Sequence, residues 1–283
     1  MQHVTVLGTG VLGAQIIFQS AYRGKDVVAY DISDQILAAL PQRFELLKQY
    51  YRQDLSDVTE AKLEAAIARI RATSDLADAV HDADIVIEAI PERLDIKQST
   101  WEQVSKFAPP TTVFCTNSST LLPSAIAPFT DRPERFLALH FANSIWKNNT
   151  AEVMMQPKTD PGVFDQVVTF AEEIGMVPIR LYKEQPGYVL NSLLVPLLNA
   201  AAGLWVRDIA SIEDIDATWR IATGAPLGPF QIFDVVGMMT PYNLSKDSPD
   251  PGRRAFAERL KKDYIDNGWL GRDSGRGFYD YHK

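Results

Sequence analysis

The chain has 283 residues, 46% of them hydrophobic and 23% charged, and a formal net charge of −8 at pH 7. This length allows two domains with sizeable cores, and the negative charge argues against nucleic acid or an anionic membrane as a partner. Cys115 is the single cysteine, which excludes an intrachain disulfide and favours a reducing compartment, so we expect a cytoplasmic protein. No signal peptide is expected, because the first strand should begin near His3.

The first residues combine an apolar strand with a glycine-rich turn. The run 3–7 leads directly into G-x-G-x-x-G, and a helix-compatible run follows. The glycines permit a tight turn, close approach of a pyrophosphate and packing of the helix on the strand, and the helix N-terminus attracts phosphate. A second apolar run then ends in an acid, which a glycine-rich turn of another βαβ unit would not explain. The predicted cofactor contacts of this unit are Gly8, Gly10, Val11, Leu12, Gly13 and Asp31.

Asp31 also distinguishes between the two nicotinamide cofactors. Its carboxylate can accept hydrogen bonds from both ribose hydroxyls of NAD, whereas it would repel a 2′-phosphate. No arginine follows directly, since the next residues are Ile32, Ser33 and Asp34. NAD is therefore expected rather than NADP.

Strand and helix patterns alternate through the first two-thirds of the chain, which predicts an α/β fold with a Rossmann-like, doubly wound, mostly parallel sheet. Strands are expected at 3–7, 27–31, 84–88, 112–116, 136–141, 151–156 and 177–182, and helices at 11–23, 33–53, 57–71, 92–107 and 161–174. The segment 33–71 is too long for one crossover helix, so a projecting helical hairpin is expected there.

Gln185-Pro186-Gly187 marks the predicted domain boundary. Residues 1–185 form the expected NAD-binding domain, and residues 186–283 form an expected all-α domain. The long apolar run 188–206 contains polar residues and Pro196, so we interpret it as a buried, kinked helix rather than a membrane span.

Polar side chains at the carboxyl ends of strands are the candidates for chemistry. His140 ends one apolar strand and Glu152 interrupts the next, and their spacing allows a strand, a turn and a return strand. A dehydrogenase needs a base, and a carboxylate on the second imidazole nitrogen would orient a histidine base. The alternative is a structural histidine and a solvent-facing glutamate.

Two further polar positions have equally open interpretations. The loop 117–120 follows a strand at the ligand-binding edge, although its serines could simply cap a helix. Asn191 lies at the start of the long apolar helix, where its amide is a candidate for a hydrogen bond across the cleft between the domains, although it fits a helix-start or polar core residue equally well. The histidines at 3, 81, 140 and 282 show no ligand spacing, so no metal site is expected.

Several longer segments carry a family resemblance. They are GTGVLGAQI (8–16), ATSDLADAVHDADIVIEAIPERLDIKQ (72–98), TNSST (116–120), LHFAN (139–143), AEV (151–153), PGYVLNSLLVPLLNAA (186–201), TGAPLGPFQIFDVVG (223–237) and GWLGRDSGRGFYDY (268–281). With these segments the chain resembles the 3-hydroxyacyl-CoA dehydrogenases, particularly the short bacterial 3-hydroxybutyryl-CoA dehydrogenases, over essentially its whole length.

The resemblance implies an NAD-dependent oxidoreductase of fatty acid metabolism that interconverts 3-hydroxyacyl-CoA and 3-ketoacyl-CoA and forms a homodimer. It implies His140 as the catalytic base, Glu152 as its partner, Ser119 as the serine that hydrogen-bonds the substrate's 3-oxygen, and Asn191 as a residue that holds the substrate. The positions implied on the nicotinamide side are Glu92, Lys97, Asn117 and Asn143. Lys48 and Arg52 are the implied contacts of the CoA phosphates.

Two departures from the family pattern leave the substrate open. The loop 144–150 lacks the family's proline and is more polar, and the hairpin bend 53–57 is acidic where relatives tend to be basic. These departures favour an alternative in which the substrate is a 3-hydroxy acid without CoA, such as a sugar acid or a carnitine-like compound. A further alternative is a non-enzymatic NADH-binding or structural protein, which would not need an oriented base.

Overall fold

The structure is a computed structural model that describes residues 1–282. The chain divides into two compact units, and it passes from the first to the second between Val189 and Leu190. The first is an α/β unit with an eight-stranded sheet, and the second is helical. The predicted fold class is therefore confirmed. The boundary that we predicted from the sequence lies between 185 and 186.

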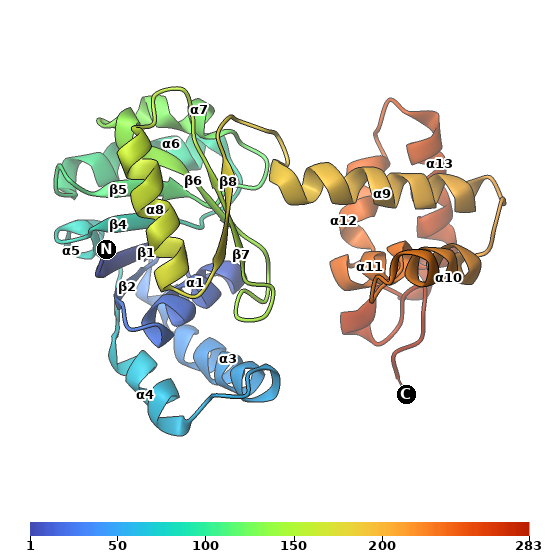
Figure 1. The fold of residues 1–283 in the computed structure, drawn as a ribbon, viewed down its shortest axis with the longest axis horizontal. Coiled ribbons are helices and arrows are strands. Elements are labelled where there is room, and N and C mark those ends of the chain that lie inside the picture. Colours follow the sequence, from blue (N-terminus) through green and yellow to red (C-terminus); the bar gives the residue numbers. More distant parts are fainter. Residues whose placement is uncertain (283) are drawn as a thin grey trace. The chain divides into compact units, whose positions relative to one another are not determined.

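The sheet has the strand order β3-β2-β1-β4-β5-β6-β7-β8 (Figure 1). Its strands are β1 His3–Leu7, β2 Asp26–Tyr30, β3 Ile70–Thr73, β4 Ile85–Glu88, β5 Val113–Thr116, β6 Phe136–Phe141, β7 Thr150–Met154 and β8 Val177–Leu181. Neighbouring strands run parallel except β6 and β7, which are antiparallel. Cys115 lies in β5 near the middle of this sheet and has no exposed surface, and burial raises the pKa of its thiol.

The strand β3 is absent from the sequence prediction, which extends a helix to residue 71. It is a four-residue edge strand with two exposed side chains, so its sequence carries little of the hydrophobic signal on which strand prediction depends. The preceding helix ends at Ala68 instead.

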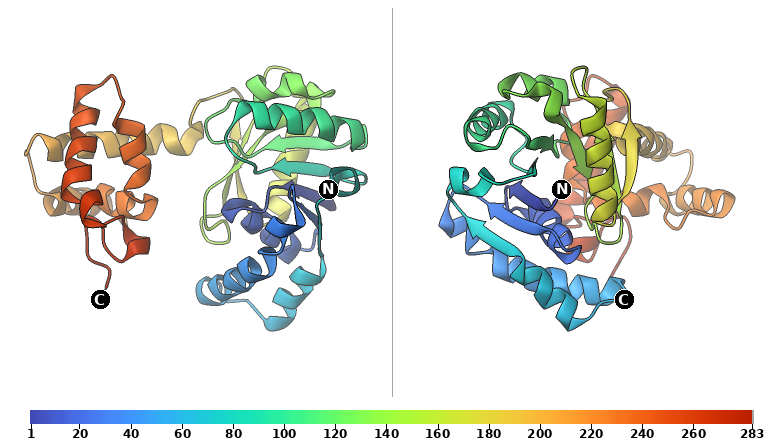
Figure 2. Two further views of the ribbon diagram at one scale, coloured as in Figure 1. Left: turned by 180° about the vertical axis from the view of Figure 1, so that it is seen from behind. Right: turned by 60° about the vertical axis from the view of Figure 1, so that its left-hand side comes forward.

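Helices cover both faces of the sheet (Figure 2). The helices of the first unit are α1 Val11–Tyr22, α2 Asp34–Leu37, α3 Leu40–Asp54, α4 Glu60–Ala68, α5 Leu76–Val80, α6 Leu94–Phe107, α7 Pro123–Ile126 and α8 Pro161–Glu173, with short 3₁₀ turns η1 Ala127–Phe129 and η2 Pro133–Arg135. Residues of α1, α3, α4 and α8 share one core with the sheet, and residues of α5, α6 and α7 share the other. The helices α3 and α4 form the predicted hairpin.

The helix predicted over 33–53 is split into α2 and α3, so this part of the prediction is wrong. Ser33 caps α2 through a hydrogen bond from Ile36 N, and α3 begins again with Pro41 in its first turn. Proline fits that position because the first turn of a helix needs no N–H donor from it.

The helices of the second unit are α9 Tyr188–Val206, α10 Ile212–Thr223, α11 Pro229–Val236, α12 Met239–Ser245 and α13 Pro251–Asp263, with 3₁₀ turns η3 Ile265–Asn267 and η4 Arg272–Ser274. Two buried aspartates connect them. Asp216 accepts hydrogen bonds from the N-terminal amides of α11, and Asp234 accepts from the amides of Phe278 and Tyr279. The contacts of Asp234 explain why an acid stands in the largely apolar segment of α11.

The sequence predicts a buried helix over 188–206, and this is wrong for the single chain. By length and composition α9 is the one helix among residues 1–282 that could cross a membrane. Only 22% of its apolar window is buried, whereas a core helix would be mostly buried. Leu198, Ala201 and Trp205 pack into the core of the second unit, whereas Leu193 is 70% exposed. One stripe of the helix therefore packs, and its other apolar residues do not.

Candidate active site

The side chains of His140 and Glu152 face each other across the antiparallel pair β6–β7. The register places the two residues directly opposite one another, and the Nδ1 atom of His140 lies 3.0 Å from Oε2 of Glu152. Both residues are buried. The predicted hairpin spacing thus brings the two side chains together, since residues opposite each other in antiparallel strands lie on the same face of the sheet.

Ser119 contacts the other nitrogen of the same imidazole. The Oγ of Ser119 lies 3.1 Å from Nε2 of His140. Ser119 is exposed, whereas His140 is buried. The second carboxylate oxygen of Glu152 accepts a hydrogen bond of 2.8 Å from the amide of Val189, at the start of α9. Ser119, His140 and Glu152 therefore form a continuous hydrogen-bonded line from the surface into the sheet.

Glu92 organises the loop that carries Ser119. Its Oε1 accepts hydrogen bonds from the hydroxyls of Ser118 and Thr120 and from the amides of Thr120 and Leu121. Although burial raises its pKa, these hydrogen bonds and the charge of Lys97 lower it to about 2. Glu92 is therefore an ionised anchor of the loop at neutral pH.

Asn117 holds the start of the same loop. Its Oδ1 accepts a hydrogen bond of 2.9 Å from the amide of Phe141, in β6. The side chain thus joins the end of β5 to the strand that carries His140. Asn143, predicted on the same side, follows β6, and its backbone carbonyl accepts a hydrogen bond from the side chain of Asn148.

A groove passes over the glycine turn of the first βαβ unit. A cavity of about 800 Å³ is lined by Gly8, Thr9, Asp31 and Arg43, among others. It shares Gly10 and Ala89 with a second cavity of about 320 Å³, which reaches Glu92, Lys97, Asn117 and Ser119. All these residues except Thr9, Arg43 and Ala89 belong to the predicted site.

The geometry of the turn requires glycine at positions 8 and 13. A Cβ on Gly8, whose φ is +97°, would lie 2.5 Å from the carbonyl oxygen of Ala89, and one on Gly13 would lie 2.0 Å from the oxygen of Gly8. Asp31 accepts hydrogen bonds from the amide and hydroxyl of Thr9, while Arg43 donates to the carbonyl of Thr9. A Cβ on Gly10 would meet nothing within 4 Å, so the groove is open beside the turn, and the carboxylate of Asp31 lines the same groove.

Glu88 is a charged residue of this site that sequence reasoning missed. It ends β4 with no exposed surface, and it accepts hydrogen bonds from Lys97 Nζ at 2.5 Å and from Thr116 Oγ1 at 2.9 Å. The available signal was an acid at the carboxyl end of a buried strand, the pattern that identified Asp31. Lys97 is buried as well and lies 3.3 Å from Glu92, so the smaller cavity contains two carboxylates and one ammonium group.

The basic residues of the hairpin are already paired with carboxylates. Lys48 Nζ lies 2.8 Å from Glu45 and 2.7 Å from Glu64, and Arg52 binds both carboxylate oxygens of Glu60. The structure thus places Lys48 and Arg52 in ion pairs within α3 and α4.

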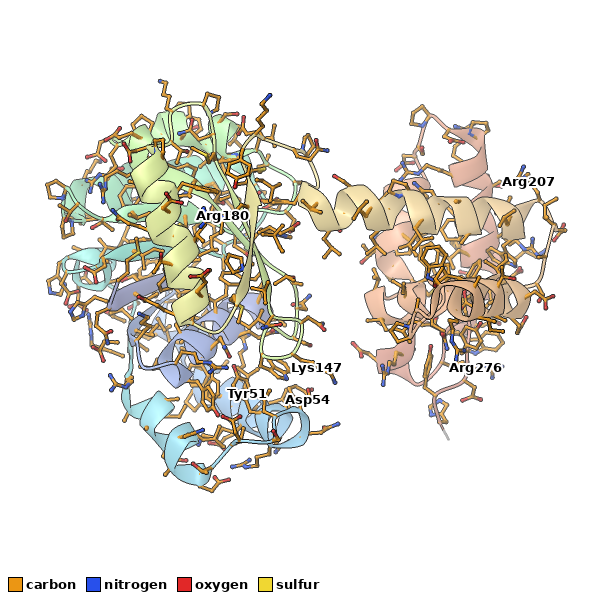
Figure 3. The ribbon with its side chains drawn as sticks, viewed as in Figure 1. Tyr51, Asp54, Lys147, Arg180, Arg207 and Arg276 are labelled. Carbon is orange, nitrogen blue, oxygen red and sulfur yellow. The ribbon has the colours of Figure 1, made fainter. Side chains whose placement is uncertain are left out.

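The polar loop 144–150 and the acidic hairpin bend contact each other (Figure 3). Asp54 accepts hydrogen bonds from Trp146 Nε1 at 2.9 Å and from Lys147 Nζ at 3.0 Å, which hold the pKa of its carboxyl below the usual range. The indole of Trp146 also stacks on Tyr50. The two departures noted in the sequence are therefore the two halves of one contact.

Asn191, the remaining predicted residue, lies on α9 in the second unit.

Comparison with known proteins covers nearly the whole chain. Residues 3–185 match the family model of the 3-hydroxyacyl-CoA dehydrogenase NAD binding domain, and residues 187–281 match that of the C-terminal domain. The human mitochondrial hydroxyacyl-coenzyme A dehydrogenase is 34% identical over 291 residues, which span 99% of this chain and 91% of the human protein. The probable 3-hydroxybutyryl-CoA dehydrogenase of Bacillus subtilis (strain 168) is 31% identical over 294 residues, or 100% of this chain and 98% of that protein.

Among solved structures, a diketoreductase described for substrate-directed dual catalysis of dicarbonyl compounds is similar throughout. It is 56% identical, with a TM-score of 0.96 and 99% of both chains covered.

Proposed function

Because the chain belongs to the 3-hydroxyacyl-CoA dehydrogenase family, we propose that it interconverts a 3-hydroxyacyl compound and its 3-keto form with NAD. The observation that carries this proposal is the hydrogen-bonded line of Ser119, His140 and Glu152. A module that merely binds NADH has no need for a buried histidine oriented on one side by a carboxylate and open on the other to an exposed hydroxyl.

The residues of the groove fit NAD. Gly8 and Gly13 allow the tight turn and the packing of α1 on it, while the space beside Gly10 is open for a pyrophosphate, and Asp31 lines the groove where a ribose would be bound. Gly8, Gly10 and Gly13 would hold the pyrophosphate, and Lys97 and Glu92 would lie on the nicotinamide side. The chemistry that NAD supplies when bound is the acceptance of a hydride from the hydroxyl-bearing carbon.

The protein's own part is the movement of the proton. When Nδ1 of His140 donates to Glu152, its Nε2 is unprotonated and can accept the proton of the substrate hydroxyl. Glu152 then stabilises the imidazolium that forms and keeps the ring in one orientation. Ser119, 3.1 Å from Nε2, is placed to hydrogen-bond the same substrate oxygen, and Asn191 holds the substrate, as the family resemblance implies.

The structure gives a specific reason to consider a substrate without CoA. Lys48 and Arg52, the expected phosphate contacts, each pair with carboxylates of the same hairpin. A CoA phosphate would have to compete with those carboxylates and would face the negative charge of the hairpin. The likeness to a diketoreductase supports this second candidate, a reductase of small dicarbonyl compounds. The CoA form of the proposal would give the chain a role in fatty acid metabolism.

The test is the rate of NADH oxidation with acetoacetyl-CoA, free acetoacetate and a β-diketo ester. A higher kcat/KM with the thioester supports the CoA form, and a Lys48→Ala, Arg52→Ala double variant should then raise the KM for the thioester alone. A higher kcat/KM with the free compounds, unchanged in that variant, supports the second candidate. Absence of NADH oxidation with every compound would contradict both.

A further inference from the structure

Tyr188 lies against the catalytic histidine although nothing in the proposed mechanism uses it. It is the first residue of α9 and belongs to the first unit by its contacts. The side chain is buried, and its ring stacks on the imidazole of His140 with centroids 4.3 Å apart and planes 15° from parallel. Sequence reasoning included it in the long apolar helix and in a segment of the family resemblance, without a role of its own.

The hydroxyl of Tyr188 contacts the loop 117–120, which carries Ser119. It donates a hydrogen bond of 2.5 Å to the backbone carbonyl of Ser118. That carbonyl belongs to the peptide unit that joins Ser118 to Ser119, and the Oγ of Ser119 contacts Nε2 of His140. A single side chain therefore contacts both the imidazole and the peptide unit that leads to its hydrogen-bonding serine.

The backbone at Tyr188 is held in an uncommon conformation. Its φ is +54°, in the left-handed region that an aromatic residue seldom adopts. Such a conformation persists where surrounding contacts determine it. The next residue, Val189, donates its amide to Glu152 at 2.8 Å, so this strained start of α9 contacts both the histidine and its carboxylate.

We propose that Tyr188 is a positioning residue for the His140 base, through its ring for the imidazole and through its hydroxyl for Ser119. This inference rests on the proposed function, since it assigns Tyr188 a part in that base. The π face of a tyrosine stabilises a positively charged neighbour more than a neutral one, so the stack favours the imidazolium that forms when the substrate proton is taken up.

The surroundings of Tyr188 keep its hydroxyl protonated. Burial raises the pKa of Tyr188, and the negative charges of Glu152, Glu92 and Glu88 raise it further. The hydroxyl therefore remains a donor to Ser118 across the pH range in which the enzyme would be assayed. These carboxylates, with Lys97 beside Glu88 and Glu92, are the charged groups to consider in any pH dependence of this region.

Two substitutions separate the ring from the hydroxyl. Tyr188→Phe retains the stack and removes the hydrogen bond to Ser118, whereas Tyr188→Leu removes both. We expect Tyr188→Phe to lower kcat about threefold to tenfold and Tyr188→Leu to lower it about 100-fold, the size of effect that misplacement of a catalytic group produces. Tyr182→Phe is the matched control, because Tyr182 is 69% exposed.

The pH dependence of the His140 imidazole, followed by NMR, distinguishes positioning from a general structural role. The chain has four histidines, so the NMR signals of the His140 imidazole can be resolved and assigned. We expect the titration midpoint of His140 to fall in Tyr188→Leu and to stay within about 0.2 pH units of wild type in Tyr188→Phe and Tyr182→Phe, because the stack favours the charged ring. Circular dichroism and the Kd for NADH show whether each variant is folded.

The outcomes are distinct for the two proposals. If Tyr188→Leu is folded and retains both the wild-type midpoint and a kcat within twofold, the positioning role is wrong. The role is also wrong if Tyr188→Phe and Tyr188→Leu shift the midpoint equally. If the midpoint moves as expected but wild-type protein oxidises NADH with none of the 3-keto compounds, the contact with His140 stands and the proposed function fails.

Discussion

Replacing Glu92 by glutamine tests how strongly the Ser119 loop depends on one carboxylate. The glutamine retains the shape and one acceptor oxygen, but it loses the charge that the surrounding donors and Lys97 stabilise. We expect a lower free energy of unfolding and a lower kcat, because the loop would no longer hold Ser119 in a fixed position against His140.

The magnitude follows from the pKa of Glu92. Burial raises this pKa, yet hydrogen bonds from Ser118 and Thr120 and the charge of Lys97 bring it to about 2, from an ordinary value of 4.5. At 1.36 kcal/mol per pKa unit, the upper bound of the stabilisation is about 3 kcal/mol. Because 36% of the side chain is exposed, screening by solvent reduces the expected loss to about 1–2 kcal/mol.

The pH dependence of this loss has a definite sign. A carboxyl whose pKa is lowered in the folded state stabilises the fold fully above its unfolded pKa and loses that contribution as the pH falls through the folded value. The difference in unfolding free energy between wild type and Glu92→Gln should therefore be constant above about pH 5 and should disappear between about pH 4.5 and pH 2.

Guanidinium chloride unfolding between pH 7 and pH 2.5 measures this difference. Glu102→Gln is the control, because Glu102 is an exposed residue of the neighbouring helix α6 that contacts Gln98. A loss in Glu92→Gln no greater than that in Glu102→Gln, or a loss that is the same at every pH, would refute the reasoning.

Three further predictions concern the reaction, the cofactor and the assembly. His140→Gln should lower kcat by about 10²–10⁴ with little change in the Kd for NADH, and Glu152→Gln should mainly lower kcat; a near-normal kcat in His140→Gln would make the pair structural. NAD should be preferred to NADP by at least about tenfold in kcat/KM, or about 1.4 kcal/mol, and Asp31→Ala should narrow that gap; equal values for wild type would contradict the role of Asp31. We also propose a homodimer through the second unit, because Leu193 and Ile221 are 70% and 84% exposed; sedimentation as a monomer at micromolar concentration would contradict it.

Much of the site could be predicted because its residues stand at the ends of strands. Asp31 and His140 are polar residues that follow apolar runs, and the spacing from His140 to Glu152 matches a hairpin. Glu88 occupies an equivalent place at the end of β4, but no glycine motif or second polar residue accompanies it in the sequence. Tyr188 was missed because an aromatic residue in an apolar helix is usually a core residue.

Other features depend on contacts that no local pattern contains. Asp54 and Trp146 lie 92 residues apart in the chain, so the hairpin bend and the polar loop look like unrelated departures until the fold brings them together. The edge strand β3 is short and half exposed, and tertiary pairing with β2 rather than its own sequence makes it a strand. The prediction that α9 is buried is wrong because apolar composition indicates that a surface is suited to burial, but it does not identify the element or chain that buries it.

The single thiol of the chain provides a built-in reporter of how often this architecture opens. Cys115 lies in β5 with no exposed surface, one residue before the strand ends at Thr116. An alkylating reagent can reach its sulfur only after the core between the sheet and its helices opens, so in native conditions the labelling rate, divided by the rate for an unprotected thiol, gives the population of that opened state. With one cysteine in the sequence, mass spectrometry would yield a single modified species. If the opened state does not bind NADH, occupation of the neighbouring groove should slow the labelling by a factor of one plus the ratio of the free NADH concentration to its Kd.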